Sequence, residues 1–184
     1  MTGSLRAVCV AICAAVVVAL AAPPTASAWR FTFYKHTNIH SNLSFAWVDP
    51  YDGLVYSASW RAGSGVSTNA CWVDHGWLPS GYYDMTGHVD HFDDRIKGRV
   101  WRLSDKRCSN GQLRTALFIH TEESPWHGQW CEPWCWDGDV DYYSEGCIKV
   151  AYPYDIGALH ARYHAYGWNA HGWYTAPNAL YVYG

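Results

Sequence analysis

Short apolar segments separated by turn residues make up the first half of this chain and indicate strands. Residues 29–34 are aromatic or β-branched, and residues 43–48 partly alternate between apolar and polar side chains. The turn DPYDG at 49–53 joins this second segment to a third at 54–60. Proline and glycine spaced in this way reverse the chain between two half-buried strands. The pattern therefore predicts a mainly β fold.

The second half of the chain adds more predicted strands and one helix. Residues 99–103 form a short predicted strand, and the turn SNG at 109–111 leads into another at 113–120. Three apolar residues recur at helical spacing within 155–166, which predicts a helix there. The chain closes with a predicted strand at 179–183. No internal repeat or linker interrupts this succession, so we expect one domain.

Residues 1–28 have the three parts of a secretory signal peptide. One basic residue near the start is followed by an apolar run over 7–22 and by the small-x-small end Ala26-Ser27-Ala28. A membrane anchor is the alternative, but the run is shorter than the roughly 20 residues of a spanning helix. We therefore expect cleavage after Ala28, no stable membrane anchor, and a secreted monomeric domain over 29–184 in the extracellular space or the cell wall.

Charge and aromatic content narrow the range of partners. The formal net charge is −3 and the chain has no basic run, so nucleic acid is not an expected partner. The chain contains 12 Trp and 14 Tyr, more than a core of this size can bury completely. Exposed aromatic faces suit sugar rings and peptides. The alternative for any one of these residues is that it fills a thin β core.

A histidine and a cysteine each stand at the edge of a predicted strand. His120 directly follows the apolar run 116–119, and the turn SEGC at 144–147 precedes another apolar segment. A neighbouring imidazole can take the proton of the Cys147 thiol and so make it a nucleophile. Gly146 has no Cβ, which lets the backbone bend sharply and direct N–H groups at a developing oxyanion.

This order of residues resembles the L,D-transpeptidase (YkuD-like) family, whose signature is a strand-end histidine followed later by Ser/Thr-x-Gly-Cys. The matching parts here are FIH at 118–120 and SEGCIKV at 144–150. A second match is GWLPSGYY at 76–83, which resembles the Gly-x-x-Pro-x-Gly-x-Tyr turn of the family. The positions that differ from the common family pattern are Thr121, Glu145 and Lys149.

The resemblance implies both a fold and an activity. The fold would be a β-sandwich of two small mixed sheets with one or two short helices. The activity would be acyl transfer on peptidoglycan stem peptides through a Cys147 thioester, with no cofactor and no metal. His120 would act as the base, Gly146 would help to form the oxyanion site, and Ser144 would position His120 or the substrate. The substrate contacts we expect are Thr121, Glu145, Lys149 and Trp126.

The interval between His120 and Cys147 is longer than is usual in the family, which indicates an insertion over 122–143. The insertion carries four tryptophans, namely Trp126, Trp130, Trp134 and Trp136. They could cover the cleft as a lid that excludes water, or they could pack around a local disulfide. The sequence leaves both interpretations open.

The number of cysteines predicts one free thiol. Two of the seven cysteines lie in 1–28, and an odd number in an exported protein suggests two disulfides and one thiol. The short separation of Cys131 and Cys135 makes a bridge between them plausible, which leaves Cys71 with Cys108. Cys147 is then the free thiol; the alternative is that Cys147 pairs and another cysteine is free.

The sequence allows two other kinds of function. The protein could be a non-catalytic module that binds cell wall or glycan through surface aromatic residues, in which case Cys147 is incidental. His88, Asp90 and His91 are metal-ligand types, but nothing later in the sequence clearly completes a ligand set, so we predict a solvated loop there. If the protein is an acyltransferase, the acceptor stays open: an amine gives a cross-link, water gives carboxypeptidase activity, and a free D-amino acid gives exchange.

Overall fold

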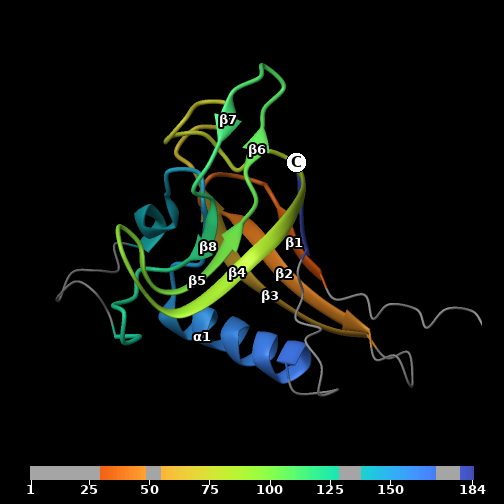
Figure 1. Cartoon of the computed structure of the whole chain (residues 1–184), viewed down its shortest axis with the longest axis vertical. Coiled ribbons are helices and arrows are strands. Elements are labelled where there is room, and N and C mark those ends of the chain that lie inside the picture. The colour runs from red at the N-terminus through yellow and green to blue at the C-terminus, as the bar shows by residue number, and fades with distance from the viewer. Residues whose placement is uncertain (1–29, 49–54, 129–137, 169–178) are drawn as a thin grey trace, which may run out of the picture.

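The computed structural model describes residues 30–48, 55–128, 138–168 and 179–184, and these form a mainly β fold, as the sequence predicted (Figure 1). The elements are β1 (Arg30–Tyr34), β2 (Ser41–Val48), β3 (Val55–Ser64), β4 (Gly81–Asp93), β5 (Lys97–Leu103), β6 (Lys106–Arg107), β7 (Leu113–Arg114), β8 (Phe118–His120), the 3-10 turn η1 (Gly138–Tyr142), β9 (Ile148–Lys149), α1 (Pro153–Arg162), the π-helical turn η2 (Tyr163–Trp168) and β10 (Ala179–Tyr183). The predicted segment 1–28 and the turn at 49–53 lie outside the described residues.

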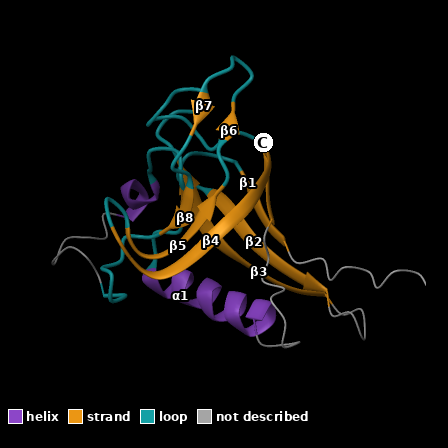
Figure 2. Ribbon diagram, viewed as in Figure 1, coloured by secondary structure: helices purple, strands orange, loops and turns teal. Residues whose placement is uncertain are grey.

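Two mixed sheets share strands at both edges and therefore close on one another. One sheet contains β1, β2 and β10, and the other contains β5, β8 and β9. Strand β3 pairs with both β2 and β9, while β4 pairs with both β10 and β5. The order around the closed sheet is β1-β10-β4-β5-β8-β9-β3-β2, and a separate small sheet pairs β6 with β7. Figure 2 shows that the β6–β7 hairpin and α1 lie at opposite ends.

The main core fills the space between the two sheets, and α1 contributes to it. Trp101, Ile119 and Ile148 are among its fully buried members. Ile156 and Leu159 of α1 belong to the same cluster, so the apolar face that predicted the helix is the face that packs. Among the described residues, no helix has both the length and the apolar character needed to cross a bilayer.

The polar stretch after residue 83 is a strand, not the solvated loop that its composition suggested. Strand β4 extends over 13 residues and pairs with β5 through two register shifts, one between Met85 and Gly87 and one between Val89 and Phe92. Such bulges break the strict alternation of apolar and polar residues by which a strand is recognised in sequence. His88 and Asp90 therefore both belong to β4, with Asp90 inside its second bulge.

Candidate active site

The pairing of β8 with β9 fixes the positions of His120 and Cys147. The two strands run parallel, with Ile119 opposite Ile148. Both isoleucines face the main core, and side chains on a strand alternate between faces. His120 and Cys147 therefore leave neighbouring strands on the same outer face of the sheet. Cys147 packs there in a second small cluster with Phe118.

This outer face borders a cavity of about 890 Å³. The polar and sulfur-bearing residues around it include His120, Thr121, Glu122, Glu123, Ser144, Glu145, Cys147 and Lys149, together with Asp74, Asp94, Arg95, Lys97 and Arg102. Phe92, Ile96 and Phe118 form an apolar part of the wall. Seven of the eight residues predicted as catalytic or substrate-binding thus reach one cavity or, in the case of Gly146, the turn beside it.

His120 is buried and oriented by the main chain. Its Nδ1 lies 3.0 Å from the carbonyl oxygen of Thr121. A carbonyl only accepts, so Nδ1 carries the hydrogen and Nε2 keeps its lone pair. Burial lowers the pKa of His120 to about 4. At neutral pH the imidazole is therefore a free base.

Cys147 is buried on the same face, and its thiol is protonated at rest. Sγ lies 3.6 Å from the carbonyl oxygen of Ala116. Burial raises the pKa of the Cys147 thiol to about 11, although the Phe118 N–H and the Arg114 charge act in the opposite direction. Among the described residues, no hydrogen bond joins Cys147 to His120. The pair rests as a neutral thiol and a neutral imidazole, and the thiol must rotate away from Ala116 to reach the base.

The hydroxyl of Ser144 forms the turn that precedes the cysteine. Ser144 Oγ donates to the carbonyl oxygen of Cys147 at 2.7 Å, and accepts from the N–H of Gly65 at 2.9 Å and of Gly146 at 3.2 Å. These contacts give the hydroxyl a role in shaping the turn, and the expectation that Ser144 positions His120 or the substrate stays a prediction. They also occupy the Gly146 N–H, so Cys147 supplies the better backbone donor for an oxyanion.

Gly146 is required at its position for two reasons. Its φ of +110° lies in a region that residues with a Cβ rarely adopt. A Cβ there would also lie 2.0 Å from Nη2 of Arg114 and 2.9 Å from the carbonyl oxygen of Gly76. The glycine of the predicted motif is thus explained by both backbone conformation and close packing.

Arg114 holds the turn in place, and the sequence did not single it out. Its buried guanidinium donates to the carbonyl oxygens of Ala70, Gly76, Trp77 and Glu145. It thereby ties the turn before Cys147 to the loop around residues 70–77. An arginine at an apolar strand position, six residues before the predicted base, was the available signal.

The remaining predicted contacts fall into two groups. Lys149 pairs with Glu122, Glu145 pairs with Arg95, and all four border the cavity. The Thr121 hydroxyl donates to the carbonyl oxygen of Ala151 at 3.0 Å and so joins two segments, while the residue also borders the cavity.

Trp126 does not line the cavity, contrary to expectation. It is 81% exposed, and its ring lies 5.2 Å from that of His91. The other three tryptophans of the predicted lid, as well as Cys131 and Cys135, lie outside the described residues. Cys71 and Cys108 lie side by side with free thiols and interact through a hydrogen bond between them. The bridge between them stays a prediction.

A second group of chemically active side chains lies elsewhere in the fold. His88, Asp90, His160 and His164 each offer a ligand atom, and these atoms lie within 4.8 Å of one another. The expectation that nothing later in the chain completes a ligand set was wrong. His160 and His164 do so, and His91 is not a member of the group.

Comparison with models of known protein families gives no match, and comparison with curated proteins gives none either. The functional argument therefore starts from the motif and from the geometry of the site.

Proposed function

We propose that this chain is an L,D-transpeptidase-like cysteine acyltransferase that acts on peptidoglycan stem peptides. The observation that carries the proposal is the position of His120 and Cys147 on the same face of two paired strands, beside one cavity. The tight Gly146 turn and the Nδ1 contact of His120 support it.

The reaction begins with proton transfer from the Cys147 thiol to Nε2 of His120. The thiolate then attacks the carbonyl carbon between an L-centre and the following D-amino acid, and the carbonyl oxygen becomes an oxyanion. The Cys147 N–H is our candidate donor to that oxyanion, a contact worth roughly 3 kcal/mol in comparable sites. His120 returns the proton to the leaving amine, and a thioester remains.

The second half of the reaction repeats the proton transfers with a new nucleophile. An amine or water loses a proton to His120 as it attacks the thioester carbon, and the thiolate leaves and is reprotonated. Because the imidazole rests as a free base and the thiol as a neutral acid, general-base catalysis fits this site better than a pre-formed ion pair does.

Arg102 is our candidate for binding the carboxylate of the departing D-residue. Its guanidinium borders the cavity and lies 5.3 Å from the ring centroid of Phe118. The other cations of the wall, Arg95, Lys97 and Lys149, pair with acids. No described carboxylate forms an ion pair with Arg102, so its charge is available to an anionic ligand.

Intact mass spectrometry tests the proposal directly. The protein is incubated with a tetrapeptide-stem muropeptide, and we expect a mass increase equal to the muropeptide less one D-alanine. The adduct should be absent in Cys147→Ala and strongly reduced in His120→Ala. Cys108→Ala, which removes another buried thiol outside the cavity, should still form it. An adduct that persists in Cys147→Ala would overturn the proposal.

A second candidate function is non-catalytic binding of cell-wall glycan, and one surface feature favours it. Four exposed tyrosines line up across β1, β10 and β4: Tyr34, Tyr183, Tyr181 and Tyr82. Consecutive rings lie 5.4, 6.5 and 5.3 Å apart. Wall binding that survives Cys147→Ala but fails in Tyr181→Ala, with no acyl-enzyme in the parent protein, would favour this function.

A further inference from the structure

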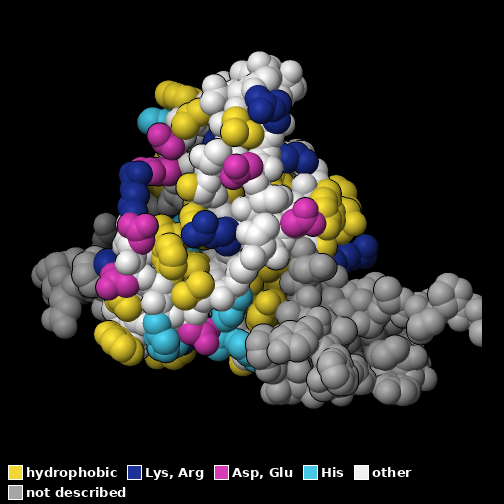
Figure 3. Space-filling view, in the orientation of Figure 1, with side chains coloured by type: hydrophobic (Ala, Val, Ile, Leu, Met, Phe, Trp, Pro, Cys, Tyr) yellow, Lys and Arg dark blue, Asp and Glu magenta, His cyan; other side chains and the backbone are white. Residues whose placement is uncertain are grey.

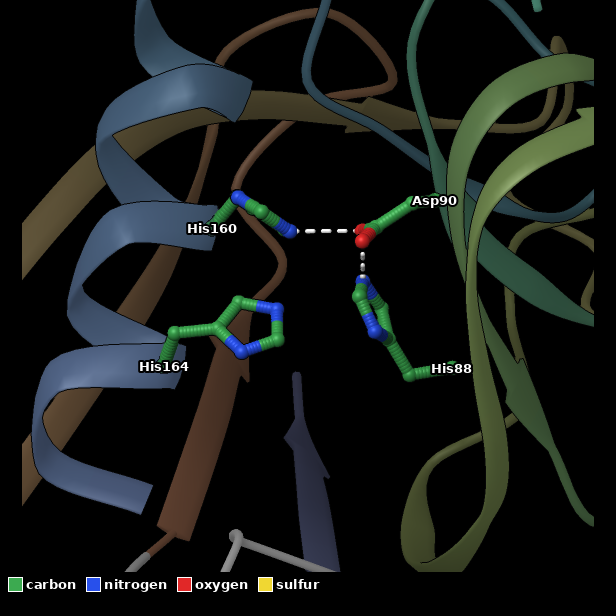
Figure 4. Close-up of side chains that lie close together, drawn as sticks. All are labelled: His88, Asp90, His160 and His164. Carbon is green, nitrogen blue, oxygen red and sulfur yellow. Dashed lines mark hydrogen bonds and ion pairs between the residues drawn. The ribbon is translucent and has the colours of Figure 1, made fainter. Parts of the chain in front are cut away.

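Two pairs of ligand-type side chains face one another between α1 and β4. His88 and Asp90 are two residues apart on β4, a spacing typical of side chains on one face of a strand. His160 and His164 are four residues apart, at the end of α1 and in η2, a spacing that puts two side chains on one face of a helix. Figure 4 shows all four side chains pointing into the space between the two elements.

The distances suit one bound ion. Asp90 Oδ1 lies 2.6 Å from Nε2 of His160 and 3.3 Å from Nε2 of His88. All four ligand atoms lie within 4.8 Å of one another. Ligand atoms about 2.0–2.1 Å from a tetrahedral zinc ion are roughly 3.4 Å apart, so shifts on the order of 1 Å would complete the coordination.

The surroundings orient the group as a metal site requires. The His88 ring packs against both Trp101 and Tyr163, with centroids 4.6 and 5.1 Å away. His88 Nε2 is buried and makes no hydrogen bond within the described residues, although it is near Asp90. His127 Nε2 donates to the backbone carbonyl oxygen of Asp90 at 2.7 Å, which fixes the strand behind the carboxylate. Figure 3 shows histidine and acidic side chains together at the lower edge of the molecule.

The group is separate from the cysteine site. His88 pairs with Trp101, and Trp101 pairs with Ile119, so these three side chains share the inner face. Phe118, His120 and Cys147 belong to the other face. An ion at this place would therefore not touch the reacting atoms of the proposed acyl transfer.

We propose that His88, Asp90, His160 and His164 bind a single divalent transition-metal ion, most favourably Zn²⁺, which fastens α1 to β4. Three imidazoles and one carboxylate are ligands that zinc accepts in tetrahedral geometry. Four protein ligands leave no open coordination position, so the role of the ion is structural. Binding must release any proton on the imidazoles, so zinc affinity falls in acid.

Metal content and metal-dependent stability test this site. The purified protein is stripped with a chelator, and Zn²⁺ alone is added back by equilibrium dialysis with elemental analysis. We expect one zinc per chain and a rise in melting temperature that the chelator reverses. Co²⁺ should give the intense visible absorption of a tetrahedral site. The proposal would be overturned if the protein bound no zinc above background and its melting temperature changed with neither zinc nor chelator.

Variants identify the ligands. His164→Gln and His160→Gln should each weaken zinc binding by more than about tenfold. Removing a hydrogen-bond partner of a metal ligand already lowers metal affinity about 10- to 100-fold, and removing the ligand itself should lower it further. The control is His91→Gln. His91 lies on β4, the strand of His88 and Asp90, but outside the ligand group, so this variant should keep full zinc affinity. Equal zinc binding in His164→Gln, His160→Gln and His91→Gln would refute the assignment. Cys147→Ala should bind zinc normally, so failure of the acyl transfer leaves this test unaffected.

Discussion

Arg114 donates a hydrogen bond to the carbonyl oxygen of Glu145, 3.3 Å away, and thereby connects β7 to the turn before Cys147. The same buried guanidinium binds three carbonyl oxygens of the loop around residues 70–77. A single side chain thus holds the nucleophile's turn against the body of the protein. The positive charge also favours the Cys147 thiolate, although burial outweighs it.

Replacing Arg114 should therefore damage both stability and turnover. Arg114→Ala leaves several buried carbonyls without a donor, and we expect a loss of about 3 kcal/mol of unfolding free energy in urea titrations. Acyl-enzyme formation should fall even where the protein remains folded, because the turn loses its anchor. Arg107→Ala is the matched control, since Arg107 is exposed and bonds one carbonyl, that of Gly111. Equal effects of the two substitutions would contradict this role.

Backbone strain and close packing both require glycine at position 146, and two alanine variants separate their contributions. Gly146→Ala introduces a Cβ at positive φ and against Arg114 and Gly76, so we expect loss of the acyl-enzyme and a fall in stability of several kcal/mol. Gly111→Ala has a similar strain at φ +86°, but open space around the Cβ. It should cost only about 1–2 kcal/mol and keep activity. Thermal melts and adduct formation of both variants distinguish the two contributions.

The local sequence patterns predicted the parts of the site that depend on neighbours in the chain. The turn at Gly146 and the terminal strand appear where turn chemistry and alternation indicated them, whereas the strand predicted over 113–120 is divided into β7 and β8. The helix also appears, although it begins at Pro153 and gives way to η2 at Tyr163. Such features depend on residues that are close to one another in the sequence.

The features that the sequence did not reveal depend on distant partners. Arg114 bonds carbonyls up to 44 residues away, and Asp90 meets His160 across 70 residues. The bulges in β4 hide its strand pattern, so the ligand-type residues there resembled a polar loop. Ser144 matched the motif, yet only the folded turn shows that its hydroxyl is used by the backbone.

The protonation state of Cys147 predicts how it reacts with iodoacetamide, which attacks thiolates. With the pKa raised to about 11, the alkylation rate should rise about tenfold per pH unit between pH 7 and 10. Cys71 in the reduced protein is the internal comparison, because the hydrogen bond with Cys108 lowers its pKa, and its rate should level off earlier. Peptide mass spectrometry reads both sites. A Cys147 rate already constant at pH 7 would indicate a pre-formed thiolate instead.

The assignment of Arg102 predicts a specific change in kinetics. Arg102→Gln removes the charge that we place opposite the D-residue carboxylate, so KM for a tetrapeptide stem should rise by about tenfold or more. A substrate whose terminal carboxylate is amidated should lose this difference between parent and variant. Arg107→Gln, a change of equal charge on the β6–β7 hairpin, should leave KM unchanged. The assignment fails if the amide and the acid respond alike.

Burial of His120 predicts that the protein loses stability in mild acid. The unfolded chain takes up a proton at this residue near pH 6.5, whereas the folded protein does so only near pH 4. The unfolded state therefore binds more protons between these values, so the contribution is complete above pH 6.5 and is lost as the pH falls to 4. The loss is roughly 3 kcal/mol across this window. Urea unfolding at pH 7 and pH 4.5 should show a smaller pH dependence in His120→Gln than in the parent protein, while His36→Gln, at an exposed histidine, should match the parent. Identical pH dependence in all three proteins would show that His120 is protonated as readily in the folded state as in the unfolded chain.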